Sequence, residues 1–95
     1  MTKEMEESIQ KALSELERFK LPWQEMVQKQ LEYCLEVISE KASLDRLENL
    51  NMGLIAVREI DGREALHSLL MEIQYEMQHK YLSYAAKVRL NIHRR

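Results

Sequence analysis

The sequence predicts an all-α protein, a compact antiparallel bundle of four helices, or of five if the last helix breaks. Three observations predict this fold. Apolar residues recur at helical spacing in four segments, the turns between them are short, and the single strand-like run, Leu54–Val57, has no second run to pair with. With 95 residues, 2 Gly and 1 Pro, the chain is expected to form one domain over residues 1–95.

The first two segments are separated by Pro22. Apolar residues of the first segment follow spacings of three and four: Met5, Ile9, Ala12, Leu13, Leu16 and Phe19. Pro22 should end this helix and lie in the first turn of a second one, predicted over residues 22–42. The second helix carries one apolar stripe (Trp23, Val27, Leu31, Cys34 and Ile38) beside another row (Met26, Gln30, Tyr33 and Val37). So wide a band predicts two packing neighbours, or one neighbour and a partner protein. Cys34 is expected to be buried and unreactive.

The third segment is the most apolar of the four. Asp45 and Glu48 resemble a capping box at its start. Four leucine and valine residues then follow at helical spacing: Leu47, Leu50, Leu54 and Val57. We therefore expect the most buried helix here, ended by Gly62, and we expect Gly53 to permit close approach of a neighbouring helix.

The fourth segment, residues 63–93, is too long for a compact bundle. As one helix it would measure about 46 Å at 1.5 Å per residue, whereas a domain of this size is only about 30 Å across. It is therefore predicted to break near Gln78–Lys80 or to project at its end.

Charge and composition exclude several functions. Residues 1–64 carry a net charge of −5 and residues 65–95 one of +3, with a basic end at Lys87, Arg89, Arg94 and Arg95. The three histidines are 12 and 14 residues apart, which is not the spacing of helical metal ligands. No nucleophile–base pattern or phosphate-binding loop occurs, so we expect no enzyme, no metal and no cofactor. A pI near 5.9 disfavours nucleic acid as a partner. No apolar run is long enough for a membrane span or signal peptide, and one cysteine without an export signal indicates the cytoplasm.

Three segments in order resemble a known family. They are KQLEY at residues 29–33, LDR at residues 44–46, and LNMGLIAVREID at residues 50–61. They are similar to segments of bacterial immunity proteins that protect against a type VI secretion effector, an NAD(P)⁺ glycohydrolase. Patterns of that family read KQLxY, LDR and GxIAVKExD. Arg58 stands where the family has Lys, and Ile60 where it has an aromatic residue.

The resemblance implies a protein without catalysis that binds and occludes its toxin domain in the cytoplasm. The free protein would be a monomer or a weak homodimer, and the complex with toxin 1:1. The apolar motif residues are interpreted as core. The polar and amphipathic ones are candidate toxin contacts, with neighbouring acids added: Lys29, Tyr33, Glu36, Arg58, Glu59, Asp61 and Glu64. Tyr33 would be an apolar anchor and the acids would pair with toxin lysines or arginines, provided that the second helix lies beside the turn after the third.

Two other functions stay open at the sequence level. The same wide apolar rows would suit a homodimeric helical adaptor or secretion chaperone. The basic end would suit a small nucleic-acid regulator, whose binding to duplex DNA would depend steeply on salt.

Overall fold

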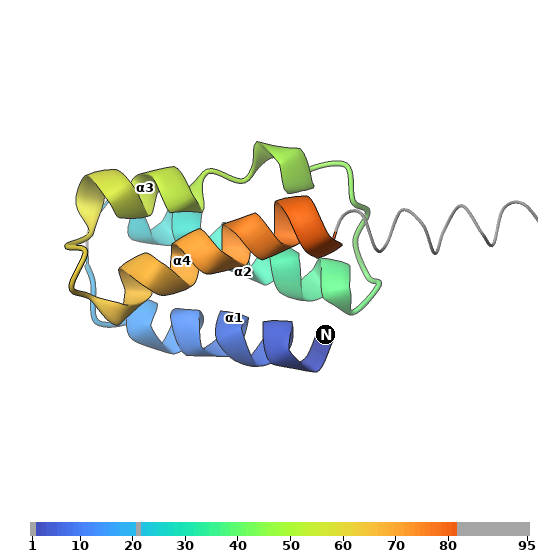
Figure 1. Ribbon diagram of the computed structural model, residues 1–95, viewed down its shortest axis with the longest axis horizontal. Coiled ribbons are helices and arrows are strands. Elements are labelled where there is room, and N and C mark those ends of the chain that lie inside the picture. Colours follow the sequence, from blue (N-terminus) through green and yellow to red (C-terminus); the bar gives the residue numbers. More distant parts are fainter. Residues whose placement is uncertain (1, 21, 82–95) are drawn as a thin grey trace, which may run out of the picture.

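The computed structural model describes residues 2–20 and 22–81, and all regular structure in these ranges is helical. Four α-helices form the bundle: α1 (Thr2–Leu16), α2 (Gln24–Ile38), α3 (Met52–Glu59) and α4 (Ala65–Tyr75). A short 3₁₀ helix, Leu47–Asn49, precedes α3, and a π-helical stretch, Glu76–Tyr81, continues α4. Successive helices run in opposite directions along the long axis (Figure 1), so the predicted antiparallel all-α bundle is confirmed.

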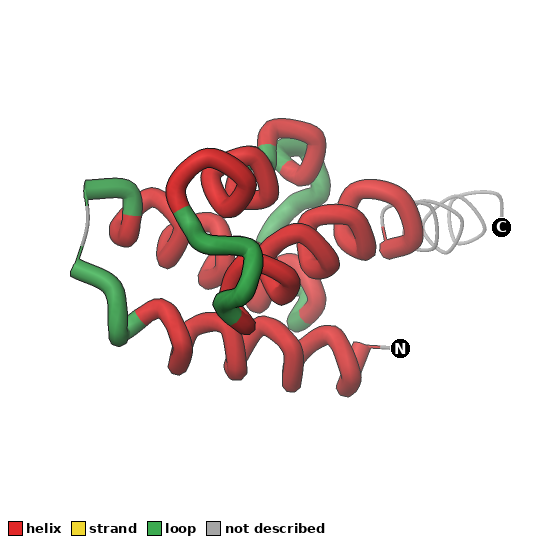
Figure 2. Tube along the Cα trace, turned by 60° about the vertical axis from the view of Figure 1, so that its left-hand side comes forward, coloured by secondary structure: helices red, strands yellow, loops and turns green. Residues whose placement is uncertain are grey.

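The helices enclose one apolar core. α1 packs against α2 and α4, whereas α3 packs mainly against α4. Figures 1 and 2 show α1 and α3 on opposite sides of the bundle, with α2 and α4 between them. The largest fully buried side chains include Ile9, Leu31, Leu47, Leu70 and Met77. No helix in the described ranges is both long and apolar enough to cross a membrane.

The link between α1 and α2 is longer than predicted. α1 ends at Leu16, and the Gln24 side chain donates a hydrogen bond of 3.0 Å to the Leu16 carbonyl left open there. Phe19 packs against Trp23 across the link, with ring centres 5.7 Å apart. α2 begins two residues after Pro22, so the expectation that Pro22 lies in its first turn is wrong.

α2 also ends earlier than predicted, at Ile38 instead of Ala42. The Lys41 N–H bonds the Glu36 carbonyl at 2.8 Å, and the Glu40 N–H bonds the Val37 carbonyl at 3.0 Å. This is a Schellman motif, which requires a left-handed residue, and Glu40 adopts φ 61°. The sequence did not reveal this stop because glycine, its usual signal, is absent.

The third predicted helix is interrupted near its start. Asp45 accepts a hydrogen bond from the Ser43 hydroxyl and does not cap a helix, so the predicted capping box is wrong. After the 3₁₀ turn, Leu50 is extended (ψ 132°), and α3 begins only at Met52. It ends at Glu59 with an extended Ile60, before Gly62, whose φ is not positive.

α3 is not the most buried helix. Met52, Gly53 and Ala56 are buried, but Leu54 and Val57 are 50% and 57% exposed. Within the part of the chain that the structure describes, α3 packs mainly on α4, so the side that carries Leu54 and Val57 stays open to solvent. At Gly53, α3 meets α4 through a side chain, because an added Cβ would lie 3.1 Å from Oε1 at the end of Gln74.

The fourth segment does not break near Gln78–Lys80 but continues as a helix to Tyr81, and the alternative of a projecting end lies outside the described residues. α-helical hydrogen bonding gives way at Glu76 to a π-helical stretch that contains Gln78–Lys80. Tyr81 is buried at its end, and its hydroxyl contacts the Val37 carbonyl at 3.3 Å. The basic end of the chain lies outside the described residues.

Candidate functional site

The candidate contacts on α2 take part in different interactions. The Tyr33 hydroxyl donates to the Ser43 carbonyl at 2.6 Å and accepts from the Arg46 N–H at 3.1 Å. The Arg46 guanidinium lies 5.0 Å from the Tyr33 ring centre, and burial raises the pKa of the Tyr33 hydroxyl. Tyr33 therefore fastens the loop after α2. Lys29 is exposed and pairs with Glu25 at 3.3 Å, and Glu36 is exposed.

The other four candidates lie on or after α3. Arg58 and Glu59 are exposed on its last turn. Asp61 accepts two hydrogen bonds from the Arg63 side chain, at 3.0 and 3.2 Å, and this pairing lowers the pKa of the Asp61 carboxyl. Glu64 lies 3.5 Å from the Arg18 guanidinium.

The seven candidates do not form one cluster. Figure 1 shows the end of α2 and the turn between α3 and α4 at opposite ends of the bundle. Tyr33 lies toward the first of these, because it holds Ser43 and Arg46, whereas Asp61 and Glu64 lie in the second. The expected nearness of these two groups is therefore wrong, and Arg58, Glu59, Asp61 and Glu64 remain as neighbours.

A groove lies between the beginning of α2 and the outer side of α3. Its volume is about 420 Å³, and most of its lining is apolar. The lining residues are Pro22, Trp23, Met26, Asn51, Leu54, Ile55, Arg58 and Glu59. Met26 is 52% exposed and Leu54 50%, so the two walls offer large apolar side chains to solvent. Arg58 and Glu59 bring charges of both signs to the same groove.

Two glutamines fix the position of α3 beside this groove. Gln30 on α2 accepts hydrogen bonds from the Asn51 and Met52 N–H groups at 2.9 and 3.0 Å, and it donates to the Asn51 side chain. Gln74 on α4 accepts from the Gly53 N–H at 2.7 Å. These are backbone donors at the start of α3 that no residue of the helix itself can satisfy. The groove wall is therefore bonded to both α2 and α4.

One polar atom at the groove has no partner. The Trp23 indole nitrogen is buried and meets no hydrogen-bond acceptor among the described residues. A buried donor without an acceptor costs stability.

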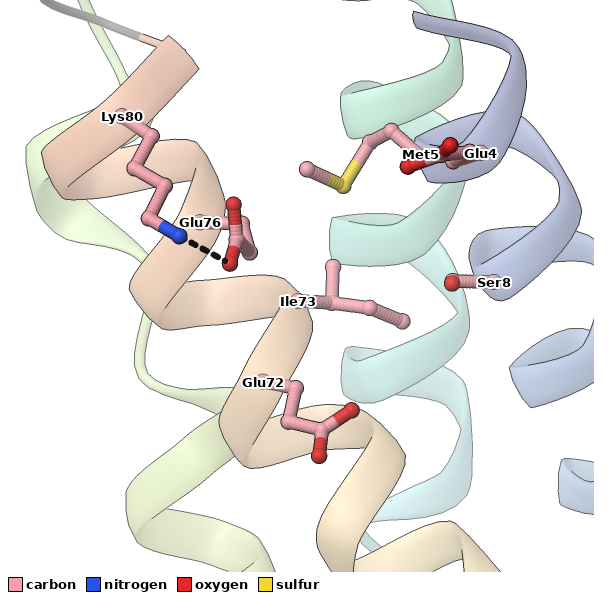
Figure 3. Close-up of a pocket in the computed structure, with 7 residues that line it drawn as sticks. All are labelled: Glu4, Met5, Ser8, Glu72, Ile73, Glu76 and Lys80. Carbon is pink, nitrogen blue, oxygen red and sulfur yellow. Dashed lines mark ion pairs between the residues drawn. The ribbon is translucent and has the colours of Figure 1, made fainter. Parts of the chain in front are cut away.

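A second groove lies between α1 and α4 and is acidic (Figure 3). Glu4, Glu72 and Glu76 line it, with Lys80 bonded to Glu76 at 3.1 Å. Met5 and Ile73, both buried, form its floor. Carboxylates in this groove contribute to the negative charge on this side of the bundle.

Sequence reasoning missed the apolar part of the first groove. Leu54 follows the same helical spacing as residues that are in the core, so the spacing alone predicted that Leu54 is buried as well. Met26 belonged to the second apolar row of α2, whose excess width was the available signal. Gln30 and Gln74 bond across helices, and no local pattern reveals such contacts.

Comparison with protein families gives one result. A family model described as Tsi6 matches residues 4–80, which include all four helices almost completely. No curated protein and no solved structure gives a significant match.

Proposed function

The chain belongs to the Tsi6 family of type VI secretion immunity proteins, and we propose that it neutralises its cognate toxin by occluding the toxin domain. The complex forms in the cytoplasm with 1:1 stoichiometry, and the free protein is a monomer or a weak homodimer. The target is an NAD(P)⁺ glycohydrolase-type effector. The family match over residues 4–80 is the observation that carries this proposal.

The surface of the bundle supports a role in protein binding. Five large apolar side chains are exposed, on α2, α3 and α4: Met26, Leu54, Val57, Met71 and Tyr75. Two of them line the same groove, between α2 and α3. Exposed apolar side chains that gather with polar neighbours are typical of interaction sites.

The NAD(P)⁺ glycohydrolase target is supported by the three family-like segments. The first lies in α2, the second leads into the 3₁₀ turn, and the third spans α3. The third segment includes the groove residues Asn51, Leu54 and Arg58. The first segment supplies Gln30, which hydrogen-bonds the start of α3.

The acids at the turn after α3 assist association. Asp61 and Glu64 remain exposed or half-buried although each contacts an arginine, and Glu59 lies on the same end of the bundle. Negative groups near a docking surface attract a basic partner and raise the association rate. Charge reversal at Asp61 and Glu64 should slow association and reduce its salt dependence, while the fold stays intact.

A homodimeric adaptor or chaperone is the competing function. Val57, Met71 and Tyr75 favour it, because they leave apolar surface exposed outside the groove. Sedimentation velocity at about 1 μM, where a weak dimer dissociates and a stable one persists, separates the two functions. A stable dimer favours the adaptor.

The direct test pairs this protein with the toxin domain of the effector encoded beside its gene. Cells that express the toxin domain alone should lose NAD⁺ and stop growing, and co-expression of this protein should restore both. Purified proteins should bind with nanomolar affinity, or about −12 kcal/mol. Growth rescue without NAD⁺ loss in the unprotected cells would retain immunity but overturn the glycohydrolase target. Absence of binding and of rescue would overturn immunity itself.

A further inference from the structure

We propose that the groove between α2 and α3 is the docking site for the toxin domain, and that it receives a protruding apolar side chain with a carboxylate beside it. This inference rests on the proposed function and assigns it a surface. The apolar side chain lies between Met26 and Leu54, and the carboxylate pairs with Arg58.

The apolar contact follows from exposure and shape. Met26 and Leu54 come from different helices, line one groove, and are each about half exposed. A volume of about 420 Å³ is within the range of sites that enclose a compact group. A side chain inserted there removes apolar surface from water on both walls at once, which is how central anchors contribute most of the affinity of an interface.

The charged contact follows from which groups are already paired. Lys29, Asp61 and Glu64 each contact an opposite charge within the chain. Arg58 and Glu59, in contrast, form no ion pair among the described residues. Both line the groove, and of the two the Arg58 guanidinium can bind a carboxylate through two parallel hydrogen bonds. A toxin surface with an apolar side chain next to Asp or Glu is therefore complementary to it.

The groove is formed before the partner arrives. Gln30 and Gln74 bond the first three N–H groups at the start of α3 from two directions. Ordering a binding wall at the moment of association would weaken the complex, and here that cost is already met by folding. The toxin therefore encounters an α3 wall whose start is already hydrogen-bonded to α2 and α4.

The same shape disfavours a second copy of this chain as occupant. In a two-fold dimer whose axis passes through this groove, the groove of one copy would face the groove of the other. Two hollows in contact leave a void, whereas a protruding side chain on a different protein fills one. The partner that the proposed function gives for this chain is the toxin domain, so we assign the protruding side chain to it.

Two methionines provide a matched test. Met26 lines the groove and is 52% exposed, whereas Met71 lies on α4 outside it and is 43% exposed. Met26→Glu and Met71→Glu introduce the same charge at similar exposure. Circular dichroism first establishes that both variants fold, and calorimetric titration against the neighbouring toxin domain then measures affinity. Met26→Glu should weaken binding at least thirtyfold, and Met71→Glu less than threefold.

Further outcomes separate this inference from the function on which it rests. Arg58→Glu should weaken binding at least tenfold, and Arg58→Lys less than that.

If wild-type protein binds and protects but Met26→Glu and Arg58→Glu bind equally well, the groove is not the docking site, and the immunity function stands. If wild-type protein fails to bind, the proposed function itself fails. A wild-type dimer that Met26→Glu dissociates would make the groove a contact between copies and overturn the toxin assignment.

Discussion

α1 and α3 lie on opposite sides of the bundle, and they differ in how completely their apolar residues are buried. α1 buries Met5, Ile9, Ala12 and Leu16 almost completely. α3 buries Met52 and Ala56 but leaves Leu54 half exposed and Val57 slightly more than half exposed. Both segments show helical periodicity, so the difference arises from cover: α1 packs on two long helices, and α3 packs mainly on one. The helix with incomplete cover is the one that lines the groove.

Cys34 of α2, in the core that α1 covers, tests the buried side of this comparison most strongly. Its side chain is fully buried in the core, and burial raises the pKa of its thiol to about 12. Labelling at pH 8 should therefore require unfolding and be about a thousandfold slower in native than in denatured protein. Leu54→Cys in a Cys34→Ala protein should instead label within about tenfold of the denatured rate. Equal rates for the two native proteins would show that the core side is open.

Truncation should separate the two helices by stability. Ile9→Ala removes a fully buried side chain of α1 and should destabilise the fold by about 3–4 kcal/mol. Leu54→Ala removes a half-exposed side chain of α3 and should cost less than about 1 kcal/mol. Urea unfolding of both variants measures the difference. Similar losses would mean that Leu54 is a core residue and that the comparison fails.

The two glycines test the contact between α3 and α4. Gly53→Leu pushes against Gln74 and displaces its hydrogen bond to the Gly53 N–H, at a cost of about 3 kcal/mol. Gly62→Leu should change stability by less than about 0.5 kcal/mol, because an added Cβ there meets nothing within 4 Å. Thermal unfolding of both variants tests this. Wild-type stability for Gly53→Leu would show that α3 is not held against α4.

The smallest expected change in stability comes from a substitution at the C-terminal end of α2. Glu40 occupies a left-handed position that glycine adopts without steric cost, so Glu40→Gly should stabilise the protein by about 0.5–1 kcal/mol. Glu36→Gly, inside the same helix, should instead destabilise it by about 1 kcal/mol. Urea midpoints would reveal the opposite signs. Destabilisation by both variants would contradict the Schellman motif at the end of α2.

Local patterns in the sequence predicted the helices, but they did not predict where each helix ends or which of its apolar residues are buried. The stripe from Met5 to Leu16 was interpreted correctly because its residues repeat at helical spacing and all of them meet the core. Leu54 has the same spacing, and it remains exposed because α3 packs mainly on α4 alone. The capping box at Asp45 failed because the Ser43 hydroxyl provides a nearer donor.

The candidate site depended on long-range placement, which residue types alone do not predict. Tyr33 was expected beside Asp61, but its hydroxyl holds the loop after α2 at the other end of the bundle. Gln30 and Gln74 position α3 through contacts across 21 residues of sequence. Arg58 and Glu59 were identified from their motif, and the apolar walls beside them emerged only from the fold.

Methionine methyl NMR tests the central claim most directly, because it detects contact without altering the surface. Protein labelled at the methionine methyl groups is titrated with the neighbouring toxin domain, and signals are assigned with single Met→Leu variants. The methyl signal of Met26, in the groove, should shift or broaden as the complex forms. The signal of Met71 on α4 should keep the chemical shift that it has in the free protein. A shift at Met71 with an unchanged Met26 would contradict docking between α2 and α3.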